Sequence, residues 1–186
     1  MRKDETSFDD YVLSDDYKLA SLEMNMIKNL ESTTRWLYLG ADATNPGFAR
    51  IGMTMGDLRS RSYGSVNANY YLFCAFKCRH DLSELELKQI ETAILDEFQN
   101  RYLNDDGSTK RLSFYESGYL SDCFSNVNFA EFFADLHYEI YENYRNSFVI
   151  CGMDDGAGGV DGEFVDCIFN DKVRNKDDYR RLIIQY

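Results

Sequence analysis

Apolar residues recur at helical spacing in three parts of this chain. The pattern predicts helices at about 15–30, 84–102 and 129–144. The first of these has Ser14 or Asp15 as its expected N-cap. The second opens with Ser83-Glu84-Leu85-Glu86, which has the serine-to-glutamate spacing of a capping box. These amphipathic patterns are typical of helices that pack on the core of a globular domain.

Short apolar runs predict strands between and after these helices, at about 36–40, 49–54, 70–79, 148–151, 164–169 and 181–186. The sequence Asn45-Pro46-Gly47 separates the first two runs, so we expect them to pair as a hairpin. Residues 57–65 predict a short helix or helical turn, and residues 103–110 a loop. Residues 111–128 are aromatic and polar without a clear period.

Together these elements predict an α+β protein with a small mixed or antiparallel three-stranded sheet flanked by helices. We expect an acidic N-terminal arm and helix over residues 1–34 and a central domain over residues 35–140. Residues 141–186 should form a β-rich extension that packs on this core. The 186 residues, of which 44% are hydrophobic, suffice for one such core.

Composition limits where the protein acts. No apolar run approaches the roughly 18–20 residues that span a bilayer, so we expect no membrane insertion. The N-terminus lacks the apolar segment of a secretory signal. Five cysteines, an odd number without a close CxxC pair, favour free thiols in a reducing, cytoplasmic compartment.

The net charge of −12 argues against a long, non-specific nucleic-acid groove, but the charge is unevenly distributed. Residues 35–80 contain six arginines and lysines against two aspartates, a local charge of +4. The rest of the chain therefore carries −16. A basic island in an acidic body is compatible with a small phosphate-binding site.

Glu91 is the clearest candidate for chemistry on physical grounds. It lies on the predicted helix four residues after Leu87 and four before Leu95, so it points toward the apolar stripe. A carboxylate there needs a partner, a proton or a metal ion, because burying an unpaired charge is costly. A salt bridge to an arginine, or a position at the edge of the stripe that reaches water, would also satisfy it.

Glu91 falls in an ordered set of motifs that resembles the GIY-YIG nuclease superfamily, especially its phage- and virus-associated branch. Leu37-Tyr38-Leu39 matches the first motif in its tyrosine, and Arg50-Ile51-Gly52 matches the second with arginine in place of tyrosine. Asp57-Leu58-Arg59-Ser60-Arg61 is similar to the family's Asp-hydrophobic-x-x-Arg run. The resemblance covers roughly residues 35–140, including a weak closing motif at residues 131–133.

The resemblance implies a Mg²⁺-dependent endonuclease that hydrolyses DNA phosphodiester bonds with one divalent ion, for which Mn²⁺ is an alternative. Glu91 would hold the metal, which prefers oxygen ligands. Arg61 would grip the scissile phosphate, with Arg59 as the runner-up. Tyr38 would position or deprotonate the attacking water, and Arg50 would lower the pKa of the Tyr38 phenol.

Further residues are expected around the phosphate. Tyr63, four residues after Arg59, could substitute for the missing second tyrosine. Thr54 and Lys77, together with Arg50 and Arg61, are candidate phosphate contacts, although Thr54 also fits an ordinary turn.

The missing tyrosine and the acidic remainder of the chain support an alternative function. On that interpretation the GIY-YIG-like fold is retained as a weakly active or inactive binding or inhibitory module, whose acidic surface faces a protein partner. The sequence carries no indication of oligomeric state or cleavage specificity.

Overall fold

The computed structural model describes residues 31–58, 61, 67–154 and 160–185. The helix expected at 15–30 and most of the turn expected at 57–65 lie outside these residues. None of the helices in the described ranges is long and apolar enough to cross a membrane.

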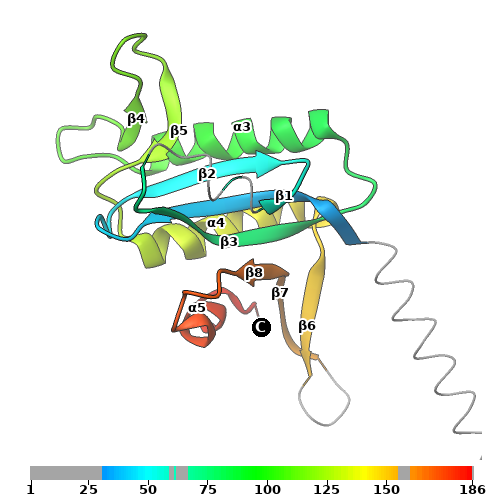
Figure 1. Cartoon of the computed structure of the whole chain (residues 1–186). Helices are drawn as coiled ribbons and strands as arrows, with labels where there is room; N and C mark the ends of the chain where they lie inside the picture. The colour runs from blue at the N-terminus through cyan, green and yellow to red at the C-terminus, as the bar shows by residue number, and fades with distance from the viewer. Residues whose placement is uncertain (1–30, 59–60, 62–66, 155–159, 186) are drawn as a thin grey trace, which may run out of the picture.

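Six strands form one sheet in the order β4-β5-β2-β1-β3-β8, and each neighbouring pair is antiparallel (Figure 1). The strands are β1 (Glu31–Asp42), β2 (Ala49–Thr54), β3 (Tyr70–Arg79), β4 (Arg111–Ser113), β5 (Leu120–Phe124) and β8 (Cys167–Phe169). Two further strands, β6 (Ile150–Asp154) and β7 (Val160–Val165), pair as a separate hairpin.

The predicted α+β class and antiparallel sheet are confirmed, and so are the hairpin β1–β2 and the strand β3. The sheet is larger than the three strands expected. β4 and β5 extend it beyond β2, and β8 extends it beyond β3. The aperiodic segment 111–128 concealed β4 and β5 because both strands are short and mostly exposed or half-buried.

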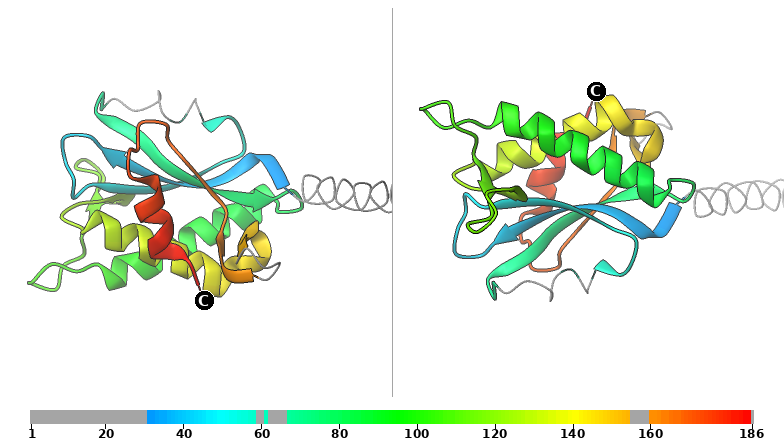
Figure 2. Two further views of the ribbon diagram at one scale, coloured as in Figure 1. Left: turned by 90° about the horizontal axis from the view of Figure 1, so that it is seen from below. Right: turned by 90° about the horizontal axis from the view of Figure 1, so that it is seen from above.

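Helices α3 (Glu84–Arg101), α4 (Phe129–Tyr144) and α5 (Lys176–Ile183) all lie on the same side of the sheet (Figure 2). A 3-10 turn, η1 (Arg145–Ser147), follows α4. The expected capping box begins α3: the amide of Glu86 donates to the Ser83 hydroxyl, and the amide of Ser83 donates to the Glu86 carboxylate. These bonds satisfy backbone donors that a helix start leaves free.

The main core lies between this face of the sheet and the helices. Leu37 and Leu39 of β1 and Ile51 of β2 are fully buried there, against Leu87 of α3 and Phe132 of α4. Since side chains alternate along a strand, the residues between them point to the other face.

The second face carries a smaller apolar cluster of Trp36, Tyr38, Leu72 and Ala75, with Leu58 packed against it. Tyr38 is therefore on the face opposite the helices.

The extension differs from expectation at its end. The strand predicted at 181–186 is wrong, because residues up to Ile183 belong to α5. The apolar run Leu182-Ile183-Ile184 resembled a strand, but only Ile183 is buried within the helix. Acidic residues in the first turn and arginines in the last turn favour a helix electrostatically.

Candidate functional site

The ring of Tyr38 covers Gly52 of β2, and it can do so because glycine has no side chain. The two residues are direct partners in the β1–β2 register. A Cβ on residue 52 would lie 2.8 Å from Cε2 of the Tyr38 ring, with the hydroxyl end closer still. The tyrosine is only 2% exposed. The glycine of the second motif therefore provides the space that fixes the Tyr38 hydroxyl in place.

A second tyrosine, Tyr70 at the start of β3, packs in the same way over Gly40 of β1. The guanidinium of Arg50 lies 5.5 Å from the centre of the Tyr70 ring. Within the described part of the chain, the buried Tyr70 hydroxyl has no hydrogen-bond partner. Burial raises the Tyr70 pKa, and the adjacent Tyr38 adds to the rise.

Arg50 joins β2 to β5. Its Nε donates to Oδ2 of Asp122 at 2.8 Å, and both side chains are about one third exposed or less. Burial acts to lower the Arg50 pKa, but the hydrogen bond to Asp122 and the neighbouring charges outweigh it and raise the pKa. The guanidinium is therefore a permanent positive charge beside both tyrosines.

Glu91 reaches β2 from the neighbouring helix α3. β5 pairs with β2 at Ala49 and Arg50. Further along β2, the backbone of Met53 lies close enough to the Glu91 carboxylate to lower its pKa. Burial raises the Glu91 pKa, and the negative charge of Asp122 raises it further, whereas Met53 and Arg50 oppose the shift.

Thr54 ends β2 and is 2% exposed. Its hydroxyl oxygen accepts hydrogen bonds from the amide of Gly56 at 3.2 Å and from Nε of Arg61 at 3.3 Å. The turn role considered for Thr54 is therefore real, and the same hydroxyl orients the exposed Arg61 side chain.

Four charged residues lie close enough to Tyr38 to affect its pKa. Burial raises the Tyr38 pKa, Arg50 and Arg61 lower it, and Asp122 and Glu91 raise it again. Burial dominates, so Tyr38 is a protonated phenol at neutral pH. In that state it donates a hydrogen bond and cannot accept a proton as a base.

Of the expected residues, Tyr38, Arg50, Thr54, Arg61 and Glu91 lie around β2, and Asp122 and Tyr70 contact Arg50 there. We call these seven residues the β2 site.

Other expected residues are not part of the β2 site. The ammonium of Lys77 pairs with Asp166 of the C-terminal extension at 2.7 Å, and both side chains are largely buried. Arg59 and Tyr63 lie outside the described residues.

Sequence reasoning missed two residues of the β2 site, Asp122 and Tyr70. Asp122 lies in the segment without a clear period, and only the pairing of β5 with β2 brings it to Arg50. Tyr70 is one of several aromatic residues in the predicted strand 70–79, and nothing in its local sequence distinguishes it. Gly52 and Gly40, which the two tyrosine rings cover, were the available signal, since glycine within a strand often marks a close approach of another group.

The β2 site has oxygen donors suited to a hard cation. Among the described residues no group of three or more His, Cys, Asp or Glu side chains could hold a metal ion. A single carboxylate can suffice for Mg²⁺, which keeps several waters and binds through one or two carboxylates together with substrate phosphates. Glu91 is the candidate ligand, because a cation would offset both the burial and the negative charge of Asp122 that raise its pKa.

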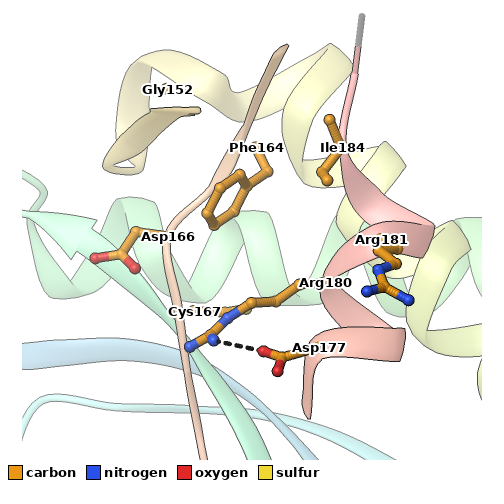
Figure 3. Close-up of a pocket in the computed structure, with 8 residues that line it drawn as sticks. All are labelled: Gly152, Phe164, Asp166, Cys167, Asp177, Arg180, Arg181 and Ile184. Atoms are coloured by element: carbon orange, nitrogen blue, oxygen red, sulfur yellow. Dashed lines mark hydrogen bonds and ion pairs between the residues drawn. The ribbon is translucent and has the colours of Figure 1, made fainter. Parts of the chain in front are cut away.

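A pocket of about 390 Å³ lies elsewhere, between α5 and the strands of the extension (Figure 3). Phe164 points into it, and Arg180 donates to Asp177 at 3.2 Å along its wall. None of the residues expected from sequence lines this pocket. Its acidic and basic groups balance, so it favours no charged ligand.

No family model, curated protein or solved structure matches this chain. The fold is that of an α+β protein with an antiparallel sheet. Because a fold alone does not imply a function, the function is argued from the β2 site.

Proposed function

We propose that this protein is a metal-dependent endonuclease of the GIY-YIG type that hydrolyses DNA phosphodiester bonds. The observation that carries the proposal is the convergence at β2. The phenol of Tyr38 lies within electrostatic range of Arg50, Arg61 and Glu91, which come from different parts of the chain. A phenol, two guanidiniums and a carboxylate form a set suited to phosphate hydrolysis.

The order of elements supports the proposal. The chain runs from the hairpin β1–β2 through β3 to α3, and α3 supplies one glutamate to the hairpin. This is the order in which the motifs resembling the GIY-YIG superfamily occur in the sequence. The family's tyrosine, arginine and glutamate positions correspond to Tyr38, Arg61 and Glu91, and the charges of Arg61 and Glu91 both act on the Tyr38 pKa.

The carboxylate of Glu91 would hold the ion, Mg²⁺ or Mn²⁺, while Asp122 remains paired with Arg50. When bound, a divalent ion supplies Lewis-acid stabilisation of charge on the phosphate. The two arginines act on the same charge. Arg61 is exposed and oriented by Thr54, so it is free to bind a phosphate oxygen through its remaining N–H groups. Arg50 adds a second positive charge, and its ion pair with Asp122 holds the guanidinium in place.

Tyr38 orients the attacking water. Its raised pKa keeps the proton on the phenol, so its hydroxyl donates to the water or to a phosphate oxygen. Arg50 and Arg61 lower the Tyr38 pKa, but their effect is smaller than that of burial, so the phenol keeps its proton. The protonated phenol is therefore suited to positioning the water and not to deprotonating it.

A cleavage assay tests the proposal. Supercoiled plasmid and labelled oligonucleotides are incubated with Mg²⁺, with Mn²⁺ and with EDTA. We expect cleavage that needs the metal and falls at least a hundredfold in Glu91→Gln, which keeps the shape and removes the charge. Glu84→Gln is the matched control, because Glu84 is exposed in the first turn of the same helix.

Absence of cleavage on every DNA and RNA substrate would contradict the proposal. Equal activity in Glu91→Gln and Glu84→Gln would also contradict it.

One observation favours the alternative of a binding module. The guanidinium that replaces the second tyrosine is already paired with Asp122, so this position supplies no base. On this alternative the protein binds DNA, or a basic protein through its acidic surface, without cutting. Retained oligonucleotide affinity with no metal-dependent cleavage would support the DNA-binding form. Capture of a partner from host extract, lost when acidic surface residues are neutralised, would support the protein-binding form.

A further inference from the structure

Exposed apolar side chains gather at one place, the tip of the β4–β5 hairpin, which we define as residues 112–120. Five of the large exposed apolar residues among the described positions belong to this tip: Leu112 at 40%, Phe114 at 57%, Tyr115 at 103%, Tyr119 at 76% and Leu120 at 40%. Figure 1 shows the hairpin reaching away from the body of the molecule beyond β2. A cluster of this kind on a soluble surface usually marks an interaction site.

Backbone hydrogen bonds hold the tip in a defined shape. The amide of Phe114 donates to the carbonyl of Tyr119 at 2.8 Å, and the amide of Gly118 donates back to Phe114 at 2.9 Å. Gly118 has a φ of +68°, which only glycine adopts without strain in this turn. The rings are therefore presented on an ordered loop, so binding would cost little conformational entropy.

The charge of the hairpin differs from that of the body. Residues 110–122 contain Lys110 and Arg111 against Glu116 and Asp122, a local charge of zero in a chain of −12. Arg111 is also paired with Asp96 of α3 at 3.3 Å, so it adds no unpaired charge to the tip. A polyanion is therefore repelled less by this hairpin and by the basic stretch 35–80 than by the acidic remainder of the chain.

The tip is continuous with the β2 site. Tyr119 precedes Asp122 by three positions on the same chain segment, and Asp122 holds Arg50. At about 3.3 Å per residue the ring begins roughly 10 Å from this contact. The tip therefore lies within about three to six nucleotides of a phosphate bound at the site.

We propose that the aromatic tip stacks on unpaired bases of the strand bound at the β2 site. The inference rests on the proposed function and names its substrate class: nucleic acid with a single-stranded or frayed segment next to the cleaved bond. Stacking on aromatic rings tolerates any base sequence, because every base has a π-face. Tyr115 and Tyr119 are the expected platforms, and Phe114, the neighbour of Tyr115 in sequence, is a third exposed ring of the tip.

Fluorescence anisotropy with a labelled single-stranded oligonucleotide in EDTA tests the proposal without cleavage. We expect the dissociation constant to rise about tenfold for Tyr115→Ala and further for Tyr115→Ala/Tyr119→Ala. The same sequence as a blunt duplex should lose less than threefold. Tyr138→Ala is the matched control, since Tyr138 is an equally large exposed tyrosine on α4. Melting temperatures check that each variant is folded.

Equal single-strand affinity in the Tyr115→Ala/Tyr119→Ala and Tyr138→Ala variants would overturn the inference. So would a wild-type protein that binds no oligonucleotide. A change in self-association or protein capture with unchanged oligonucleotide affinity would assign the tip to a protein contact and overturn it as well.

The proposed nuclease activity and the proposed stacking by the tip can be refuted independently of each other. Metal-dependent cleavage that is lost in Glu91→Gln, with unchanged affinity in the tip variants, would retain the nuclease and reject the tip. Weakened single-strand binding in the tip variants of a protein that never cleaves would retain the tip and reject the nuclease.

Discussion

Replacing Gly52 by alanine should disturb the position of Tyr38 more than any other one-carbon change in the hairpin. The added Cβ would lie 2.8 Å from Cε2 of the Tyr38 ring, with Cζ and the hydroxyl closer. Carbon atoms make favourable contact at about 3.5 Å, so the ring has to move by roughly 0.7 Å or more. Tyr38 is 2% exposed and packs with Trp36, so it has little room to move.

The expected cost follows from two opposing effects. Overpacking of a well-filled site costs about 1–3 kcal/mol. Alanine restricts the unfolded chain more than glycine does, which returns about 0.4–1 kcal/mol. We therefore expect Gly52→Ala to lower the free energy of unfolding by about 1–2 kcal/mol. If the proposed nuclease is correct, cleavage should fall at least tenfold, because catalysis is sensitive to displacements of this size.

Urea denaturation followed by fluorescence measures the free energy. Gly47→Ala is the matched control, because a Cβ at that position would meet its nearest neighbours at an ordinary 3.4 Å. The control should change stability by less than about 1 kcal/mol. In a Tyr38→Leu background the ring is absent, so Gly52→Ala should cost much less than in wild type. An unchanged urea midpoint in Gly52→Ala, or the same cost in both backgrounds, would refute this account of the packing.

Three further predictions concern stability. Ser83→Ala removes the capping box of α3 and should cost about 1 kcal/mol, read from the urea midpoint; no change would contradict the cap. His137 accepts a hydrogen bond from the Val165 amide at 2.8 Å, and burial lowers its pKa from 6.5 to about 4. The unfolded chain binds this proton first as pH falls below 6.5, so from pH 7.5 to 5 the protein should lose about 2 kcal/mol through this residue. The His137→Gln variant should show a weaker dependence of the free energy of unfolding on pH. An unchanged pH dependence in this variant would contradict the prediction. A double-mutant cycle of Arg50→Ala and Asp122→Ala should give a coupling of about 1 kcal/mol, whereas strict additivity would show that the pair contributes nothing.

Local patterns were enough to locate most elements of this fold. Alternation and the Asn45-Pro46-Gly47 turn specify the hairpin, and helical spacing with Ser83 and Glu86 specifies α3. Both signals are short-range, because turn geometry and helix caps depend on neighbouring residues. The same reasoning failed at Leu182-Ile183-Ile184, since a short apolar run fits a strand or a helix equally well.

The β2 site was predicted only in part. Tyr38, Arg50, Arg61 and Glu91 could be proposed because ordered motifs carry them. Asp122 could not, because β5 is a five-residue strand whose pairing with β2 is a long-range choice.

By itself, the sequence determined the α+β class, the β1–β2 hairpin, the capped helix α3 and a basic stretch in an acidic chain, because each depends on nearby residues. Only the tertiary structure decided that β4, β5 and β8 complete the sheet, that Asp122 pairs with Arg50, and that Glu91 lies close enough to both for their charges to affect its pKa. These residues lie 31 to 72 positions apart in the chain. They come together because the sheet order places β5 and α3 next to β2.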